Sequence, residues 1–157
     1  MVSRLARVIV AYESKYGNTK LVAEKIVEGM KEIGKIEVLL SELKEVDLNK
    51  IPNYDVILIG SPNHFGGPTW GVKKFIDKLG KISLEGKLFA VFDTYIKEDF
   101  EKAVKKMEKR INEKVPGMKQ IAPGLSIKVQ EIKGPVLDEE LPKCKDFGKK
   151  IANQLKT

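Results

Sequence analysis

The sequence contains very little cysteine or histidine, one residue of each among 157, and it has no long apolar run. A single cysteine, Cys144, excludes a disulfide framework within the chain. A helix that spans a membrane needs about 20 consecutive apolar residues, and the apolar runs here are much shorter. The stretch after Met1–Arg7 closes at Glu13, so it does not fit a signal peptide. These absences predict a cytoplasmic protein that forms one domain over residues 1–157.

A cluster of catalytic thiols or metal ligands is also missing. Cys144 shares one helical stripe with Phe147, Ile151 and Leu155, which favours a buried structural thiol. A reactive thiol would need a neighbouring histidine or cation to activate it, and the sequence indicates none.

Carboxylates are outnumbered, because 29 Lys and Arg face 22 Asp and Glu, for a net charge of +7. A basic chain can bind nucleic acid or an acidic membrane surface. Here, however, the lysines of residues 102–109 are interleaved with glutamate, and neither an arginine-rich arm nor an aromatic platform accompanies them. The charge pattern therefore predicts a solvated surface, with no nucleic-acid partner and no membrane partner.

Three short apolar runs have the composition of buried parallel strands. Val8–Ala11, Val56–Ile59 and Leu88–Phe92 are continuously apolar, which is typical of strands that are covered on both faces. Two further stretches, Ile36–Leu40 and Leu125–Val129, alternate apolar and polar residues. Alternation is typical of strands nearer the edge of a sheet.

Between these strands, apolar residues recur at helical spacing. The helical stripes are Val22, Ile26, Met30 and Ile33; Val72, Phe75, Ile76 and Leu79; and Phe100, Val104, Met107 and Ile111, followed by a C-terminal helix from near Pro142. Alternating strands and helices predict an α/β fold, a three-layer sandwich with a five-stranded parallel sheet of order 2-1-3-4-5 and helices on both faces. In such a sheet, ligands bind at the carboxyl ends of the strands, where the winding reverses. The site should therefore be built from loops 13–19, 61–70 and 93–98.

The first of these loops is rich in hydroxyl groups and leads into a helix. Its residues are Ser14, Lys15, Tyr16, Gly17, Asn18 and Thr19. Unpaired amides and the positive end of the helix dipole suit a phosphate group. The spacing fits neither a P-loop nor the three-glycine dinucleotide fingerprint, so a single phosphate monoester is the better interpretation. A capped turn without a ligand is the alternative.

The same stretch resembles the N-terminal signature of the flavodoxin family. The matching residues, in register, are Val10, Tyr12, Ser14, Gly17, Thr19, Ala23 and Ile26. Ala11 is smaller than the hydrophobe usually found at its position. The resemblance implies non-covalently bound FMN, whose phosphate is held by Ser14, Tyr16, Gly17, Asn18 and Thr19, with Lys15 as a charge partner.

Loop 61–70 combines two prolines and a Gly66-Gly67 pair with large aromatic side chains. Aromatic rings at a loop tip suit a flat apolar partner such as an isoalloxazine ring. The predicted contacts are Pro62, Asn63, His64, Phe65, Gly66 and Trp70. Alternatively, Phe65 and Trp70 pack back on the following helix. His64 either contacts the flavin, relays a proton, or has no role.

Loop 93–98 follows the fourth predicted strand. The family resemblance implies that this loop sandwiches the ring from its other side, with Tyr95 against the ring and the amides of Thr94 and Tyr95 at its edge. Asp93 either contributes to the flavin site or caps the following helix.

Taken together, the sequence predicts an FMN-binding redox protein that carries electrons between protein partners. The alternative is an NAD(P)H- or quinone-type oxidoreductase that uses paired electrons, with His64 as proton donor. Flavodoxins that act as carriers are acidic around the flavin, whereas this chain is basic, and positive charge favours the anionic reduced form. A receiver domain of the same fold is disfavoured, because Gly60 and Ser61 stand where its phosphoacceptor aspartate would be. The expected partner is a redox protein or a small-molecule electron acceptor, and the expected assembly is a monomer or small homo-oligomer.

Overall fold

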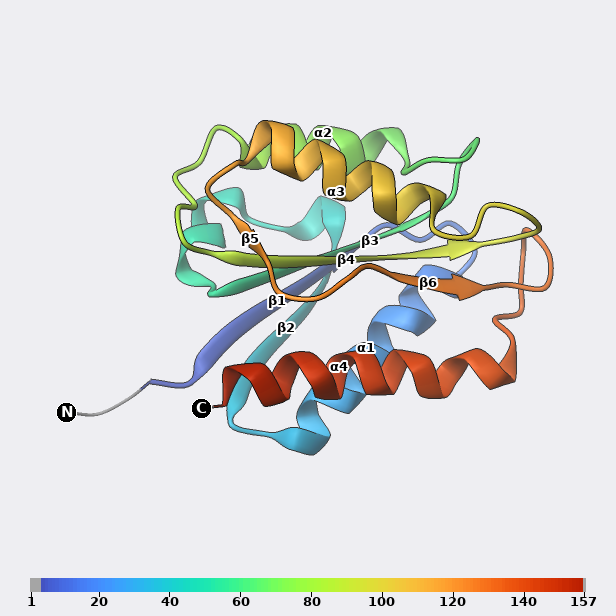
Figure 1. Ribbon diagram of the computed structural model, residues 1–157, viewed down its shortest axis with the longest axis horizontal. Helices are drawn as coiled ribbons and strands as arrows, with labels where there is room; N and C mark the ends of the chain where they lie inside the picture. The colour runs from blue at the N-terminus through green and yellow to red at the C-terminus, as the bar shows by residue number, and fades with distance from the viewer. Residues whose placement is uncertain (1–3, 157) are drawn as a thin grey trace.

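A parallel β-sheet runs through the centre of the computed structural model, which describes residues 4–156 (Figure 1). Its strands are β1 (Ala6–Tyr12), β2 (Ile36–Glu42), β3 (Val56–Pro62), β4 (Leu88–Tyr95), β5 (Lys119–Gln120) and β6 (Leu125–Lys128). The order is β2-β1-β3-β4-β5, and β6 also pairs with β4, all in parallel. The predicted order 2-1-3-4-5 is therefore confirmed.

The outermost strand next to β4 is split in two. β5 pairs with Leu88 and Phe89, and β6 pairs with residues 92–95 further along β4. Only the second piece was expected from the sequence. Pro123 lies in the intervening segment 121–124 and has no N–H to donate, which explains why the ladder is interrupted there.

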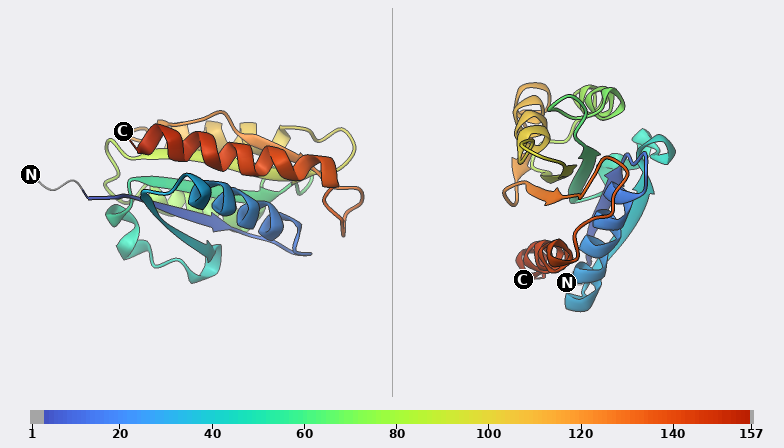
Figure 2. Two further views of the ribbon diagram at one scale, coloured as in Figure 1. Left: turned by 90° about the horizontal axis from the view of Figure 1, so that it is seen from below. Right: turned by 90° about the vertical axis from the view of Figure 1, so that its right-hand side faces the viewer.

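The helices are α1 (Asn18–Ile33), α2 (Trp70–Leu79), α3 (Lys102–Lys114) and α4 (Leu141–Leu155), with short 3-10 helices η1 (Leu43–Glu45), η2 (Leu48–Asn53) and η3 (Asp138–Glu140). α2 and α3 cover one face of the sheet, and α1 and α4 cover the other (Figures 1 and 2). No helix within residues 4–156 is both long enough and apolar enough to cross a membrane.

The predicted helical stripes form the two halves of the core. Neighbouring strand residues point to opposite faces, so that Ile57 packs under α2 and α3 while Leu58 packs under α1 and α4. One stripe residue was assigned wrongly. Phe100 precedes α3 and is 54% exposed, because the helix begins at Lys102.

α1 and α4 touch through their backbones. A Cβ atom at Gly29 would lie 2.1 Å from the carbonyl oxygen of Lys145, and one at Gly148 would lie 2.0 Å from the carbonyl oxygen of Ile26. Two glycines therefore permit a contact that any side chain would prevent. Cys144 is buried in the same layer, as predicted, and burial raises the pKa of its thiol to about 12.

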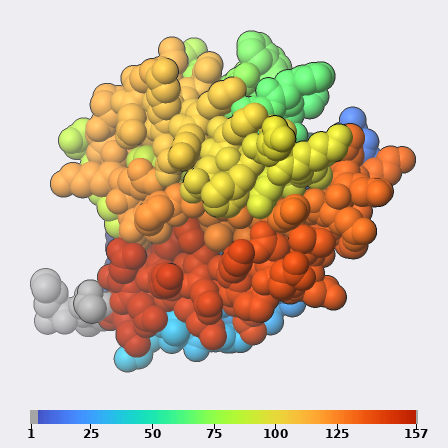
Figure 3. Space-filling model, turned by 45° about the vertical axis from the view of Figure 1, so that its right-hand side comes forward, coloured from blue at the N-terminus to red at the C-terminus, as the bar shows by residue number. Residues whose placement is uncertain are grey.

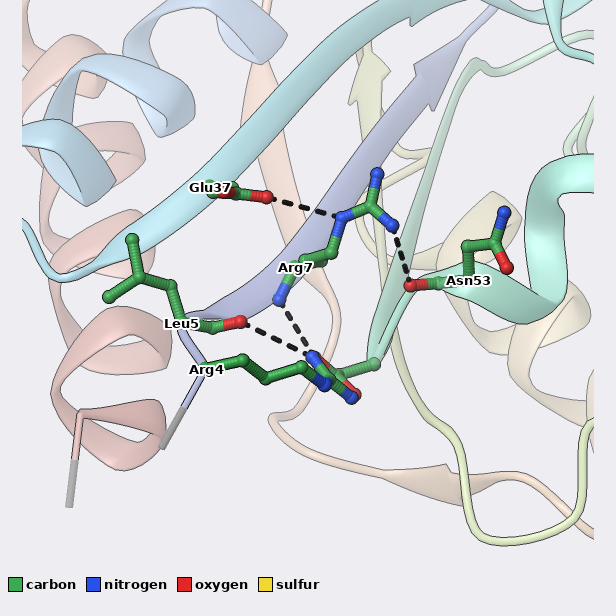
Figure 4. Close-up of polar contacts among 6 residues, drawn as sticks. Arg4, Leu5, Arg7, Glu37 and Asn53 are labelled. Atoms are coloured by element: carbon green, nitrogen blue, oxygen red, sulfur yellow. Dashed lines mark hydrogen bonds and ion pairs between the residues drawn. The ribbon is translucent and has the colours of Figure 1, made fainter. Parts of the chain in front are cut away.

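At the amino ends of the strands, charged groups are paired with one another (Figure 4). Arg4 donates two hydrogen bonds to the Asp55 carboxylate, at 2.8 and 2.7 Å, and the backbone N–H of Arg7 donates a third at 2.8 Å. The Arg7 guanidinium donates to the carbonyl of Asn53 at 3.3 Å and lies 3.2 Å from Glu37. Above all, the hydrogen bonds from Arg4 lower the pKa of Asp55 to about 2.

Candidate functional site

A cleft of about 540 Å³ opens at the carboxyl ends of the strands. This volume is within the range of about 300–1,000 Å³ that is usual for small-molecule sites. Of the residues predicted from the sequence, those that line the cleft are Ser14, Lys15, Tyr16, Asn18, Thr19, Pro62, Asn63, His64, Trp70, Thr94 and Tyr95. The fold thus brings together three loops that are far apart in the sequence, at the point where the order of the strands reverses.

The loop after β1 is shaped by Ser14 and Gly17. Ser14 Oγ accepts hydrogen bonds from the backbone N–H groups of Gly17, at 3.1 Å, and Lys20, at 3.2 Å. Gly17 has a left-handed φ of +89°, which glycine adopts without steric cost. Gly17 itself does not line the cleft, because its N–H is turned toward Ser14. Its contribution is to turn the chain into α1.

Four other amides of this loop remain available. The N–H groups of Lys15, Tyr16, Asn18 and Thr19 donate to no acceptor within residues 4–156. They lie at the N-terminus of α1, where the helix dipole adds positive potential. The Ser14 hydroxyl can still donate its proton, since its two hydrogen bonds are accepted. This set of donors matches a phosphate dianion.

The loops after β1 and β4 are joined by a hydroxyl pair. The Oγ1 atoms of Thr19 and Thr94 are 3.0 Å apart, and both residues are buried. The pair fixes the start of α1 against the end of β4, so the distance between the two walls of the cleft is set by the fold.

Loop 61–70 presents aromatic side chains at its tip. The N–H of His64 donates to the carbonyl of Gly67 at 2.7 Å, and the intervening Phe65 and Gly66 both have positive φ. This turn carries Phe65 and Gly66 outward, so neither lines the cleft, and Phe65 is 95% exposed. Trp70 lines the cleft and is 65% exposed. Neither aromatic ring is therefore packed into the helical layer.

Asn63 presents a buried acceptor at this site. Its backbone N–H and its side-chain Nδ2 both donate to the carbonyl of Thr94, at 2.9 and 3.1 Å. Its Oδ1 atom is buried and has no hydrogen-bond partner in the part of the chain that the structure describes. Such an acceptor costs about 1–3 kcal/mol unless a ligand donates to it.

The wall formed by loop 93–98 centres on Tyr95. Its ring meets that of Phe100 edge to face, with centroids 5.4 Å apart. Burial raises the pKa of Tyr95, which keeps its phenol neutral. Trp70 and Tyr95 thus face the cleft from the segments after β3 and β4.

Asp93 does not line the cleft, because β4 points its side chain to the opposite face. Its carboxylate accepts from Ser126 Oγ at 2.6 Å and from the N–H of Val104 at 3.0 Å. Val104 is in the first turn of α3, so Asp93 has the helix-capping role that the sequence left open. Complete burial raises the pKa of Asp93 to about 6.

Some lining residues were not predicted: Glu13, Thr69, Gly71, Ile96, Val129 and Ile132. The three predicted loops include Glu13, Thr69 and Ile96, but the sequence did not show that these residues face the cleft. Val129 and Ile132 come from a fourth segment, after β6, which turns back where Val129 bridges Val136. The only signal for that segment was Ile132, an isolated apolar residue among polar neighbours.

Comparison with known proteins agrees with this geometry. The sequence profile of the family described as "Flavodoxin" matches residues 10–136. A flavodoxin from Clostridium saccharobutylicum is 39% identical over 88 residues, which cover 56% of this chain and 55% of that protein. The chain spans about half the length of the curated relatives it matches.

Two solved structures superpose over nearly the whole chain. A flavodoxin from the domain Archaea has a TM-score of 0.82 and 28% identity, covering 96% of this chain and 99% of that one. Oxidised flavodoxin 2 from Bacillus cereus has a TM-score of 0.80 and 31% identity, covering 95% and 99%. Flavodoxins bind FMN, and the free amides and the aromatic walls of the cleft fit its phosphate and ring. Because the family profile spans most of the sequence, the chain belongs to the flavodoxin family.

Proposed function

We propose that this protein binds FMN non-covalently and carries electrons between protein partners. The observation that supports this function best is the set of four unpaired amides at the start of α1, at one end of a cleft with aromatic walls. Bound FMN supplies the electron chemistry. The residues of the chain bind the cofactor, orient its ring and limit the access of water.

The phosphate is held by the amides of Lys15, Tyr16, Asn18 and Thr19 and by the Ser14 hydroxyl, with the Lys15 ammonium as a further positive charge. The ring lies between Trp70 and Tyr95. Asn63 holds the wall of the cleft in place, because its backbone N–H and its Nδ2 both donate to the carbonyl of Thr94.

Binding of FMN can be tested by removing the phosphate donors. In Ser14→Ala/Thr19→Val, one hydroxyl donor and the Thr19–Thr94 contact are lost. Hydrogen bonds to charged groups contribute about 1.5–3 kcal/mol each, so we expect FMN affinity to fall at least about 10-fold. Riboflavin, which has no phosphate, should lose less than about 3-fold. Fluorescence titration of the apoprotein measures both.

Ser41→Ala is the matched control, because Ser41 lies on β2 and its hydroxyl bonds only to the carbonyl of Glu42. It should leave both affinities unchanged. Equal losses for FMN and riboflavin in the double variant would contradict the phosphate assignment, and failure of the wild type to bind FMN would refute the proposed function.

His64 supports a second candidate, an oxidoreductase that uses paired electrons. Its side chain lines the cleft and is exposed, so it is placed to give a proton to a reduced substrate. Anaerobic photoreduction separates the two candidates. Accumulation of one-electron-reduced flavin supports the carrier, whereas direct two-electron bleaching, together with turnover of a quinone that falls in His64→Ala, supports the oxidoreductase.

A further inference from the structure

Exposed apolar side chains are concentrated around the mouth of the cleft. Large hydrophobic residues that are exposed within residues 4–156 are Leu5, Tyr16, Leu39, Phe65, Trp70, Phe100 and Ile132. Of these, Tyr16, Trp70 and Ile132 line the cleft, Phe65 touches the ring of His64, and Phe100 touches that of Tyr95. We call Tyr16, Phe65, Trp70, Phe100 and Ile132 the apolar rim. In Figure 3, the green, yellow and orange surfaces of the segments after β3, β4 and β6 adjoin one another.

The rim is held in place by specific local structure. Phe65 is 95% exposed on a turn in which it has a φ of +53°, a conformation that is unusual for a bulky residue. Nothing in the hydrophobic core requires this arrangement, because Phe65 lies outside both core clusters. A contiguous group of exposed apolar side chains around a ligand cleft marks an interaction surface.

Lysine side chains surround the rim. Lys15 and Lys133 lie over the ring of Tyr16, with Nζ 5.4 and 5.9 Å from its centroid, and Lys74 lies 5.5 Å from the centroid of Trp70. The side chains of Lys102 and Lys106 lie beside Gly66 and Gly67, in the turn that carries Phe65. These residues, Lys15, Lys74, Lys102, Lys106 and Lys133, form what we call the basic ring.

Most of the basic ring is not neutralised by the protein. Lys102 pairs with Asp99 at 3.2 Å, whereas the other four lysines make no ion pair with any residue in 4–156. In the FMN-loaded protein Lys15 faces the phosphate, so the charges left for a partner are those of Lys74, Lys106 and Lys133.

Carboxylates are also present nearby. Glu101 pairs with Lys105 at 3.7 Å and Glu13 lies inside the cleft, whereas Glu98 and Glu131 are exposed beside the rim and make no ion pair in residues 4–156.

Some lysines elsewhere are neutralised by carboxylates. Between α1 and α4, Lys145 and Lys149 both pair with Glu32, at 2.7 and 3.1 Å. Lysines without an ion pair in residues 4–156, such as Lys50, Lys81 and Lys119, also lie away from the cleft, so unpaired charge alone does not mark its mouth. The cleft mouth is distinguished by lysines that surround exposed apolar side chains, and a partner that covers the apolar rim meets both.

We propose that the apolar rim and the basic ring together form the docking surface for a redox protein whose own electron-transfer face is rich in carboxylates. The inference rests on the proposed function, because it concerns the partner of the flavin. Complementary charge speeds and orients the encounter, and the apolar centre excludes water where the two redox groups approach. A second copy of this chain is a poorer occupant, since it would bring two basic rings together.

The test uses one oxidant in two charge forms. The FMN-loaded protein is photoreduced and mixed by stopped flow with a c-type cytochrome, either in its native basic form or after exhaustive succinylation of its lysines. We expect the rate constant with the succinylated form to be at least about 10-fold higher at low ionic strength and to fall as NaCl is added. With the native form it should stay flat or rise. The sign of the salt dependence is the readout, because it does not depend on the haem potential.

A pair of triple variants separates a local effect from net charge. Lys74→Glu/Lys106→Glu/Lys133→Glu reverses three charges of the basic ring. Lys50→Glu/Lys81→Glu/Lys119→Glu makes the same change in net charge outside it, at exposed lysines in η2, after α2 and in β5. The first variant should invert the preference between the two cytochromes, and the second should change either rate less than about 3-fold.

Each other outcome overturns the proposal. Equal effects of the two triple variants would mean that overall charge alone is responsible. Preference of the wild type for the native cytochrome would contradict an acidic partner. Sedimentation that shows a dimer dissociated by Phe65→Ala would assign the rim to self-association. FMN titration of every protein separates this proposal from the proposed function. If the wild type does not bind FMN, the proposed function is refuted. If all the proteins bind FMN but the rates do not follow the charge of the basic ring, only the docking proposal is refuted.

Discussion

The pairing of polar groups differs between the two ends of the sheet. At the amino ends, the carboxylate of Asp55 accepts three hydrogen bonds from Arg4 and Arg7. At the carboxyl ends, four amides of the loop after β1 and the Oδ1 atom of Asn63 are left without partners in residues 4–156. Polar groups in folded proteins are nearly always paired. The amino end pairs its charges within the chain, although Arg7 Nε forms no hydrogen bond and only faces Glu37 at 3.2 Å, whereas the four amides at the carboxyl end are free to bind a ligand.

The pKa values of two aspartates also differ between the two ends of the sheet. Asp55 is partly exposed and bound to an arginine, which lowers its pKa to about 2, whereas Asp93 is fully buried without a cation, which raises its pKa to about 6. The first charge stabilises the fold, and the second is tolerated because Ser126 and α3 donate to it. Folding should thus respond to pH with opposite sign at the two ends.

The largest expected effect comes from removing both aromatic walls. Trp70→Ala/Tyr95→Ala should weaken FMN and riboflavin alike, by about 100-fold, if each ring contributes about 1.5 kcal/mol of stacking. Fluorescence titration measures the loss. Tyr54→Ala, which removes a buried ring beneath Arg7 at the amino end, should lower the thermal midpoint but leave FMN affinity unchanged. If Tyr54→Ala also weakened FMN by more than about 3-fold, the two ends would not be independent.

The next effect concerns Asp93. The folded protein binds a proton there more tightly than the unfolded chain, whose aspartates have a pKa of about 3.9. The contribution of Asp93 to stability therefore falls as pH rises from about 4 through about 6. Asp93→Asn should lose this dependence, so that its free energy of unfolding relative to wild type improves by about 2–3 kcal/mol between pH 4 and pH 8. Urea denaturation across this range is the measurement, and a constant difference would contradict burial as the cause.

Two glycines offer a matched comparison. Gly17, at the carboxyl end, and Gly86, before β4 at the amino end, both have positive φ and have no atom within 4 Å of a Cβ position. Alanine should therefore cost each site about 1 kcal/mol of stability through backbone strain alone. Only Gly17→Ala should also weaken FMN, because the strain acts on the phosphate loop. Thermal melts and FMN titrations of both variants test this, and equal FMN affinity in the two would exclude a role for the Gly17 turn.

The smallest effect is expected for Asp55→Asn. The Asp55 carboxylate has a folded pKa below its unfolded value, so its contribution is present above about pH 4 and is lost as pH falls toward about 2. Because Arg4 is 64% exposed, solvent screening limits the contribution to about 1 kcal/mol or less. Urea denaturation at pH 7 and pH 2.5 should show a larger deficit of the variant at pH 7 than at pH 2.5, where only a minor part of the contribution remains. A larger deficit at pH 2.5 would reverse the assigned sign.

The fold was largely predictable because its strongest signals are local. Continuous apolar runs such as Val56–Ile59 require burial on both faces, and right-handed crossovers then leave few arrangements. The split outer strand was not predictable, since β5 comprises only Lys119 and Gln120, which are exposed and polar. Phe100 was misplaced because helical spacing alone does not locate the residue at which a helix begins.

The site was predictable where the sequence sets backbone geometry. Ser14 and Thr19 lie where strand, turn and helix spacing place them, and both line the cleft. Side-chain direction was harder to predict. Asp93 and Thr94 are neighbours, yet only Thr94 faces the cleft, and a shift of one residue in the expected strand end reverses that assignment. The wall that contains Ile132 is a local turn between Val129 and Val136, and its Gly134-Pro135 dipeptide indicates a turn without indicating that Ile132 faces the cleft.

The interrupted outer strand also affects how the protein can associate. A continuous free edge invites strand addition from another molecule, a common route to aggregation. Here segment 121–124 leaves no unbroken ladder along that border, and the opposite border, β2, presents the exposed acidic residues Glu37 and Glu42. The split border therefore offers no continuous ladder for another chain to extend, and the acidic residues of β2 disfavour strand addition at the other border.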